Sequence, residues 1–217
     1  KYALKNFLIM KNKKKYVIIS GEHSGDVYGS LLVKELKNLD SNTLFWGIGG
    51  KNMKDQNVAM LADVEDFSVI GFTASILKIK KLKQLMESLC VQIKKINPDH
   101  IVLIDFPGFN LSLAKKIKMS NNIPISFFIS PTIWAWGEKR INYVKKFVDQ
   151  MLVIFPFEEK YYKDRGYDRA KFIGHPFFNR IQTYDKNNVK NEFGIKNKNI
   201  PLVGIFPGSR TSELNKH

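Results

Sequence analysis

Short apolar runs alternate with longer amphipathic stretches along most of this chain. The runs are nearly continuous in apolar residues, which is typical of strands buried on both faces of a sheet rather than on one. Glycine or proline follows each run within three residues, as expected where a strand gives way to a turn. The expected strands are 16–20, 43–47, 101–104, 125–129, 151–154 and 172–174.

Leucine and isoleucine recur at helical spacing between these runs. In residues 27–39, for example, Leu32, Leu36 and Leu39 fall on one side of a helix. Strands that alternate with helices predict a parallel sheet covered on both faces. We therefore expect an α/β fold, a Rossmann-like doubly wound parallel sheet. The other expected helices are 75–96, 111–119, 138–148 and 157–165.

The two ends of the chain do not follow this alternation of strands and helices. Residues 1–14 are expected to form a tail, with Met10 as a natural start, ahead of a Rossmann-like domain over 15–183. The lysine- and asparagine-rich segment 184–199 is the expected linker. Residues 201–206 predict a buried strand that leads into a helix start, so 200–217 is expected to be the truncated start of a second domain.

The loop after the first strand carries Glu22, Ser24 and Asp26. Two carboxylates near a helix start would repel the pyrophosphate of a dinucleotide, whereas the same oxygens suit sugar hydroxyls. Simple helix capping by Ser24 or Asp26 is the alternative.

A second candidate loop follows strand 101–104 and begins with Asp105. Ligands of doubly wound sheets bind outside the carboxyl ends of the strands, where a carboxylate can act as a general base. Asn110 is placed to contact a ligand or to cap the next helix, and turn capping is the alternative for Asp105. In the third loop, Trp134 and Trp136 predict a surface that contacts sugar or acyl groups, although tryptophan is more commonly packed in a core.

Composition narrows the class of protein. The 217 residues contain 44% hydrophobic side chains, which excludes a mainly disordered chain, and one cysteine, which excludes an internal disulfide. A formal charge of +15 indicates an anionic partner: nucleic acid, an acidic membrane surface or a phosphorylated substrate. Most of that charge is lysine, so solvated lysine-rich faces are the alternative. No histidine, cysteine and carboxylate cluster has metal-ligand spacing.

One apolar stretch, 67–77, is followed by lysines at Lys78, Lys80, Lys81 and Lys83. This combination predicts contact with an anionic lipid surface, and a core-facing segment leading into a helix is the alternative. The residues expected to touch membrane or acyl chains are Val69, Ile70, Phe72, Ile76 and Leu77.

Taken in order, these segments resemble the lipid-A-disaccharide synthase family. The series runs through the loop at 21–26, the glycines at 47–50, the loop at 105–110, the Ser-Pro-x-x-Trp-Ala-Trp segment at 130–136, 172–176 and Pro-Gly-Ser-Arg at 207–210. The resemblance extends from Met10 to His217, and the 21–26 and 130–136 segments are its specific parts.

The resemblance implies an inverting glycosyltransferase with two Rossmann-like domains, the GT-B fold. It implies transfer of diacylglucosamine from UDP-2,3-diacylglucosamine to the 6-hydroxyl of 2,3-diacylglucosamine 1-phosphate, with no cofactor or metal and no nucleic acid partner. Asp105 would be the general base, and Glu22, Ser24 and Asp26 would line the same site. The residues expected to face the nucleotide are Gly208, Ser209, Arg210 and Glu213.

Location and assembly also follow from the resemblance. The chain would be cytoplasmic and peripheral on the anionic inner-membrane surface, and it would need a missing C-terminal domain or a second copy as a homodimer. We expect it to be inactive alone. Two other classes stay open: an inactive lipid-binding or membrane-associating domain, and another nucleotide-sugar enzyme of this fold, such as an epimerase.

Overall fold

The computed structural model describes residues 13–65, 76–178, 190–195, 201 and 203–206. The chain divides into two compact units, Lys1–Pro176 and Phe177–His217. All the helices and strands named below belong to the first unit. Most of the predicted linker, 184–199, lies outside the described residues.

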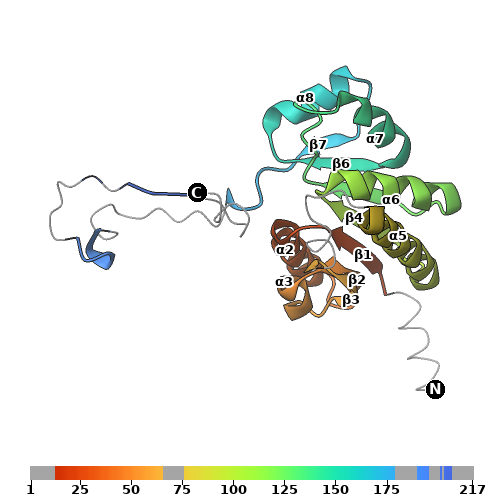
Figure 1. The fold of residues 1–217 in the computed structure, drawn as a ribbon, viewed down its shortest axis with the longest axis horizontal. Helices are drawn as coiled ribbons and strands as arrows, with labels where there is room; N and C mark the ends of the chain where they lie inside the picture. Colours follow the sequence, from red (N-terminus) through yellow and green to blue (C-terminus); the bar gives the residue numbers. More distant parts are fainter. Residues whose placement is uncertain (1–12, 66–75, 179–189, 196–200, 202, 207–217) are drawn as a thin grey trace. The chain divides into compact units, whose positions relative to one another are not determined.

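A seven-stranded, entirely parallel sheet forms the centre of the first unit, in the order β3-β2-β1-β4-β5-β6-β7 (Figure 1). This arrangement confirms the predicted Rossmann-like α/β fold. The strands are β1 (Lys15–Ser20), β2 (Leu44–Gly49), β3 (Ala59–Asp63), β4 (His100–Ile104), β5 (Ile125–Phe128), β6 (Gln150–Val153) and β7 (Ala170–Phe172). The helices are α2 (His23–Leu39), α3 (Lys51–Asp55), α5 (Ile76–Ile96), α6 (Pro107–Ser120), α7 (Ile141–Phe147) and α8 (Pro156–Asp164).

Each face of the sheet has its own apolar core. On one face, α2 and α3 contribute Val33 and Met53, which pack with Ile18 and Ile104 of the central strands. The larger core on the other face receives side chains from α5, α6, α7 and α8. Figure 1 shows the same division, with α2 and α3 beside β1–β3 and with α5 and α6 together. The continuous apolar runs of the sequence follow from this burial on both faces.

The chain reverses its direction of travel across the sheet between β1 and β4. From β1 it moves outward to β2 and β3, and from β4 it moves the opposite way to β5, β6 and β7. Ser20 and Ile104, the last residues of these two neighbouring strands, are paired with each other. The loops that follow them therefore begin side by side, at the switch point where doubly wound sheets bind their ligands.

Several boundaries differ from those predicted. The strand Ala59–Asp63 was not expected, because it is an edge strand with no fully buried residue. Helix α2 begins at His23, ahead of its leucine pattern, and α6 begins at Pro107, a residue favoured in a first helical turn. Asp26 and Asn110 consequently lie inside helices rather than in loops or at caps.

The buried strand predicted over 201–206 is wrong for the residues that the structure describes there. Residues 201 and 203–206 are not in a strand, and Val203, Ile205 and Phe206 are 78%, 84% and 93% exposed. A strand is stabilised by hydrogen bonds to a neighbouring strand. The sheet of the described residues ends at β7, so this segment has no ladder to join.

Candidate functional site

Asp105 lies immediately beyond the carboxyl end of β4, at the switch point. Its backbone N–H donates to the Phe128 carbonyl at the end of β5, with a donor–acceptor distance of 3.1 Å. Both Asp105 and Phe106 have a φ of 47°, in the left-handed region that non-glycine residues rarely occupy. Backbone strain of this kind is concentrated at functional sites, where the surrounding structure must hold it in place.

Asn110 and Gly21 supply that support. The Asn110 amide nitrogen donates to the carbonyl oxygens of Ile104 and Asp105 at 3.2 and 2.7 Å, and the residue is fully buried. A methyl group at Gly21 would lie 2.4 Å from two carbons of the Phe106 ring, so only glycine leaves room for that ring. Asn110 was predicted to contact substrate; its amide nitrogen holds the strained turn, and its buried Oδ1 has no hydrogen-bond partner among the described residues.

Asp105 is electrostatically unusual. Burial raises the pKa of its carboxyl group, and the nearby negative charge of Glu22 raises the pKa further, against the lowering effect of a hydrogen bond from the Phe106 backbone. A carboxylate with a raised pKa is a stronger proton acceptor than an exposed one. The structure thus brings together two of the predicted site residues, one from each loop at the switch point.

Tyr28 joins this group and was missed in the sequence. Burial raises the pKa of its hydroxyl group, and the negative charge of Asp105 adds to the effect. The Tyr28 ring packs edge-on against Phe128 and His175, with centroid distances of 6.2 and 6.4 Å. The available signal was an aromatic residue near the start of a helix whose apolar residues are otherwise mainly leucine.

Asp26 has a different environment from Glu22 and Ser24. Its side chain is buried, and its Oδ1 accepts the N–H groups of Gly50 and Met53 at 2.7 and 3.0 Å. Its Oδ2 accepts the backbone and side-chain nitrogens of Asn52 at 3.0 and 2.8 Å. Asp26 therefore ties α2 to the start of α3. Ser24 is exposed in the first turn of α2, and Glu22 is half-buried just before it.

The tryptophan loop follows β5, the strand beside β4. Trp134 and Trp136 are 42% and 78% exposed, so neither is a core residue. The Trp134 ring meets Phe157 of α8 edge-on, with centroids 5.1 Å apart. Behind the loop, the Ser130 hydroxyl hydrogen-bonds the buried Tyr162 hydroxyl at 2.8 Å. The structure thus leaves the two indoles accessible while fixing the start of their loop.

The described residues also bear on metal binding and on membrane-spanning helices. In the parts of the chain that it describes, no group of three His, Cys, Asp or Glu side chains is placed to hold a metal ion. Across the same ranges, no helix is long and apolar enough to cross a membrane.

Several predicted site residues are not described. Ile76 and Leu77 begin α5, but their side chains are not described. Outside the described residues lie Val69, Ile70, Phe72, Gly208, Ser209, Arg210 and Glu213.

Comparison with known proteins gives consistent matches. The family model described as lipid-A-disaccharide synthetase matches residues 16–217. A lipid-A-disaccharide synthase from Coxiella burnetii is 37% identical over 206 residues, which cover 94% of this chain and 54% of that protein. Lipid-A-disaccharide synthase 1 from Legionella pneumophila is 37% identical over 209 residues, covering 96% and 54%. The chain thus spans about half the length of the curated relatives it matches.

The fold is also shared with a solved glycosyltransferase structure from Rickettsia africae. The TM-score is 0.52 at 15% sequence identity, over 88% of this chain and 52% of that one. At this identity the likeness concerns the fold alone.

Proposed function

Because the chain belongs to the lipid-A-disaccharide synthetase family, we propose that it is the acceptor-side half of a glycosyltransferase of lipid A biosynthesis. The proposed reaction transfers diacylglucosamine from UDP-2,3-diacylglucosamine to the 6-hydroxyl of 2,3-diacylglucosamine 1-phosphate and releases UDP. The observation that carries this proposal is Asp105, a carboxylate with a raised pKa in a strained turn at the switch point of the sheet.

Asp105 acts as the general base in this proposal. The carboxylate removes the proton of the acceptor 6-hydroxyl while the oxygen forms a bond to the anomeric carbon of the donor sugar. The bond from that carbon to the UDP oxygen breaks, and UDP leaves with the electron pair from the opposite face. A raised pKa favours this role, since it brings the proton affinity of the carboxylate closer to the working pH.

UDP would be held largely by the half of the enzyme that this chain does not span. Gly208, Ser209, Arg210 and Glu213 are the proposed nucleotide contacts from this chain, with the Arg210 guanidinium offsetting charge on the departing diphosphate. We propose that the chain is inactive alone and works with a C-terminal domain, or in a homodimer that completes the site.

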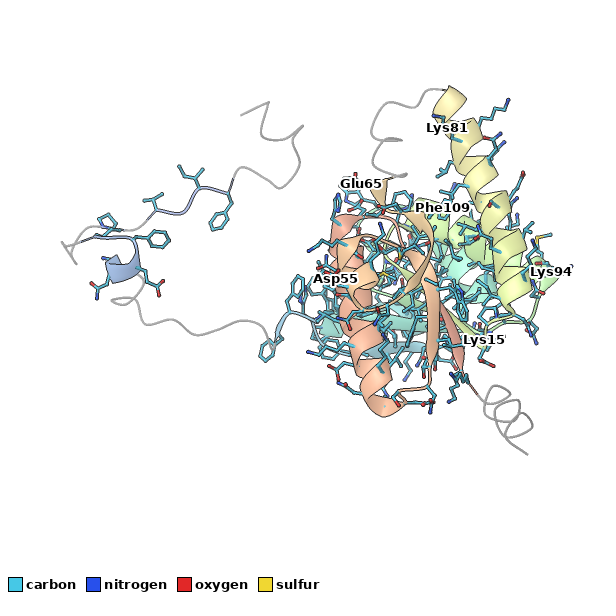
Figure 2. All side chains as sticks on the ribbon, turned by 90° about the horizontal axis from the view of Figure 1, so that it is seen from below. Lys15, Asp55, Glu65, Lys81, Lys94 and Phe109 are labelled. Carbon is cyan, nitrogen blue, oxygen red and sulfur yellow. The ribbon has the colours of Figure 1, made fainter. Side chains whose placement is uncertain are left out.

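We also propose a peripheral position on the anionic cytoplasmic surface of the inner membrane. Lys80, Lys81 and Lys83 are exposed in the first turns of α5. Figure 2 shows Lys81 at the end of the domain away from Lys15, where β1 begins, and therefore toward the carboxyl edge of the sheet. Lysines there would draw the acceptor site toward a surface that carries lipid substrates.

A reconstitution assay tests the proposed reaction. The chain is mixed with both lipid substrates in detergent, with and without the C-terminal half of the Coxiella burnetii relative, and the product is followed by mass spectrometry. We expect disaccharide only when both halves are present, and we expect Asp105→Asn to reduce turnover about 10²–10⁴-fold. The matched control is Asp63→Asn, at the end of β3 and bound to Lys54, which should stay within about threefold of the parent.

Each outcome has a clear meaning. Turnover of Asp105→Asn close to that of the parent would overturn the base assignment. Binding of the acceptor lipid without disaccharide in either mixture would support the lipid-binding alternative instead. Release of an epimerised UDP-sugar would support the epimerase alternative.

A further inference from the structure

The tryptophan loop, residues 130–140, is held against α8, and the proposed reaction does not use it. The Tyr161 hydroxyl donates to the Ile133 carbonyl oxygen at 3.3 Å. The Arg165 Nε donates to the Glu138 Oε1 at 2.7 Å, and the Arg165 guanidinium lies 3.7 Å from the centre of the Tyr161 ring. Tyr161 and Arg165 are four residues apart and therefore lie on the same side of the helix. One side of α8 thus fixes the loop at two separate points.

The loop also follows a strained residue. Ile129, the last residue before it, has a φ of 66°, a left-handed value that is an outlier for a β-branched residue. Its N–H donates to the Leu152 carbonyl of β6 at 3.0 Å, and its side chain is buried. Similar strain at Asp105 follows the neighbouring strand β4, and strain of this kind is concentrated at functional sites. The tryptophan loop therefore has the character of a binding element rather than of a simple connection.

Three aromatic rings form an exposed apolar surface where the loop meets α8. Trp134 meets Phe157 at an interplanar angle of 86°, and Phe157 stacks on Phe155 with centroids 5.9 Å apart. We call these three side chains the aromatic surface; they are 42%, 49% and 42% exposed in the order Trp134, Phe157 and Phe155. The rings follow the carboxyl ends of β5 and β6, on the same edge of the sheet as Asp105.

A positive charge lies in the same loop. A methyl group added to Gly137 would lie 3.5 Å from the Arg140 Nε, so this exposed guanidinium is placed beside Gly137, three residues after Trp134. Trp136, the residue between them and Ala135 in the loop, is 78% exposed. Apolar rings with a cation nearby are complementary to an amphiphile that has a hydrocarbon chain and an anionic headgroup.

The way in which the rings meet favours a hydrocarbon chain over a base or a sugar. Phe155 and Phe157 stack on one another at 13°, so each covers one face of the other. A base needs an open ring face on which to stack. A joined apolar surface instead suits a flexible chain, and a loop already fixed by α8 lowers the ordering cost of binding it.

We propose that the aromatic surface binds an acyl chain of the acceptor lipid and that the Arg140 guanidinium binds its 1-phosphate. The identity of this lipid rests on the proposed function. The surface itself rests on the contacts between the tryptophan loop and α8.

Fluorescence quenching tests the acyl contact directly, since a bromine atom quenches an indole only at close range. The chain is titrated in detergent with 2,3-diacylglucosamine 1-phosphate that carries brominated acyl chains. We expect quenching in the parent and its loss in the Trp134→Phe/Trp136→Phe variant, in which only Trp46 of β2 still emits. Equal quenching in the two proteins overturns the proposal.

Brominated phosphatidylglycerol in the same detergent is the control for contact with lipid in general. We expect it to quench the parent much less than the brominated acceptor does. Equal quenching by the two lipids would assign the aromatic surface to the bilayer, and it would overturn the acceptor as the occupant.

Two single variants separate the chain from the headgroup. Phe157→Ala should bind 2,3-diacylglucosamine 1-phosphate about tenfold more weakly, and it should lose as much affinity for the same lipid without phosphate. Arg140→Gln should lose about tenfold for the phosphorylated lipid and nothing for the other. Affinities equal to those of the parent in both variants overturn the proposal, and a loss in Arg140→Gln for both lipids overturns the phosphate contact.

The matched controls lie on α2, away from this loop. Leu39→Ala removes an apolar side chain that is 83% exposed at the end of α2, and Lys34→Gln removes an exposed positive charge. Both should bind the two lipids as the parent does. If Phe157→Ala does not fold, Trp134→Ala removes the same ring contact from the loop side, and parent-like affinity in that variant overturns the proposal.

The reconstitution assay keeps this inference distinct from the proposed function. Quenching by the brominated acceptor in a mixture that forms no disaccharide would overturn the proposed reaction and support the aromatic surface. Disaccharide formed without quenching would support the reaction and overturn the aromatic surface. A parent chain that binds no acceptor lipid also overturns the inference, and formation of disaccharide then still decides the reaction.

Discussion

At the scale of single residues, the backbone of Asp105 decides which substitutions are informative. A left-handed conformation costs most non-glycine residues about 1–3 kcal/mol, but aspartate and asparagine tolerate it better than others. Asp105→Asn therefore removes the charge while keeping the turn, and its oxygen can still accept the Phe106 N–H. Asp105→Ala would mix the loss of the carboxylate with new backbone strain.

The raised pKa of Asp105 predicts that the carboxylate lowers the stability of the fold. The folded chain holds the Asp105 proton more tightly than the unfolded chain, so the free energy of unfolding falls as pH rises through the raised pKa. We expect Asp105→Asn to melt at a higher temperature than the parent at pH 7. The advantage should vanish near pH 3, below the ordinary aspartate pKa of about 3.9, where the parent carboxyl is also neutral.

Thermal melts of the parent and of Asp105→Asn between pH 3 and pH 7 test this prediction. Asp168→Asn, at an exposed aspartate, controls for the change in net charge and should melt with the parent at every pH. An equal gain in both variants would attribute the effect to overall charge rather than to the site.

Gly21 provides a second residue-scale prediction. In Gly21→Ala the new methyl group would overlap the Phe106 ring, which must then shift together with the turn that carries Asp105. We expect the free energy of unfolding to fall by about 1–3 kcal/mol in urea titrations. Gly108→Ala is the matched control, because no atom lies within 4 Å of its added methyl group and alanine favours the helix by up to about 1 kcal/mol. Equal losses in the two variants would contradict the steric argument.

Sequence reasoning could place Asp105 and Glu22 because strand ends can be recognised from apolar runs. It could not identify Tyr28, since the importance of Tyr28 depends on the charge of Asp105, a side chain far away along the chain. Nor could it show that the Asn110 amide nitrogen holds the turn at Asp105, because those hydrogen bonds depend on how the chain folds in three dimensions.

At the scale of elements, the most regular patterns were the most predictable. Helix α5 was expected over 75–96 and runs from Ile76 to Ile96, because its apolar positions repeat over many turns. Helix α3 and strand β3 were missed, since five residues are too few for a period to be read and an edge strand is only half-buried. What fixes α3 in the fold is a contact from another helix, the Asp26 carboxylate.

Asp26→Ala should consequently destabilise the chain through α3. It would leave the Gly50, Asn52 and Met53 N–H groups without their acceptor, and each lost bond to a charged group costs about 1.5–3 kcal/mol. We expect a loss of roughly 3 kcal/mol or more, measured by urea unfolding. Asp26→Asn, which retains one oxygen, should lose about half as much.

The exposed Asp55 on the same helix supplies the control, and Asp55→Asn should change stability by less than about 0.5 kcal/mol. If Asp26→Asn were as stable as the parent, the hydrogen bonds from Asp26 to the start of α3 would not stabilise the fold. The predicted contact with substrate would then be the better explanation for this side chain.

At the scale of the whole molecule, a parallel sheet collects its functional loops on one edge. The segments that resembled a known family were scattered from 21 to 210, yet three of them follow the neighbouring strands β1, β4 and β5. This gathering could be predicted, because parallel strands all end on the same side. The strand expected over 201–206 could not be judged from its own apolar pattern, since a strand also depends on the neighbour that pairs with it.

The same edge carries the last prediction, which concerns the membrane. If the start of α5 faces anionic lipid, replacing Lys80 and Lys83 with glutamine should weaken sedimentation with vesicles of about 30% phosphatidylglycerol. At about 1 kcal/mol per lysine the loss would be roughly 30-fold in partitioning, and 0.5 M salt should abolish the difference. The control replaces Lys94 and Lys95, which are exposed in the last turn of α5, at the end where Figure 2 labels Lys94. This double variant removes the same amount of positive charge. Equal losses in the two double variants would mean that the net charge of +15 attracts the lipid surface wherever the lysines lie. The proposed orientation on the membrane would then be wrong.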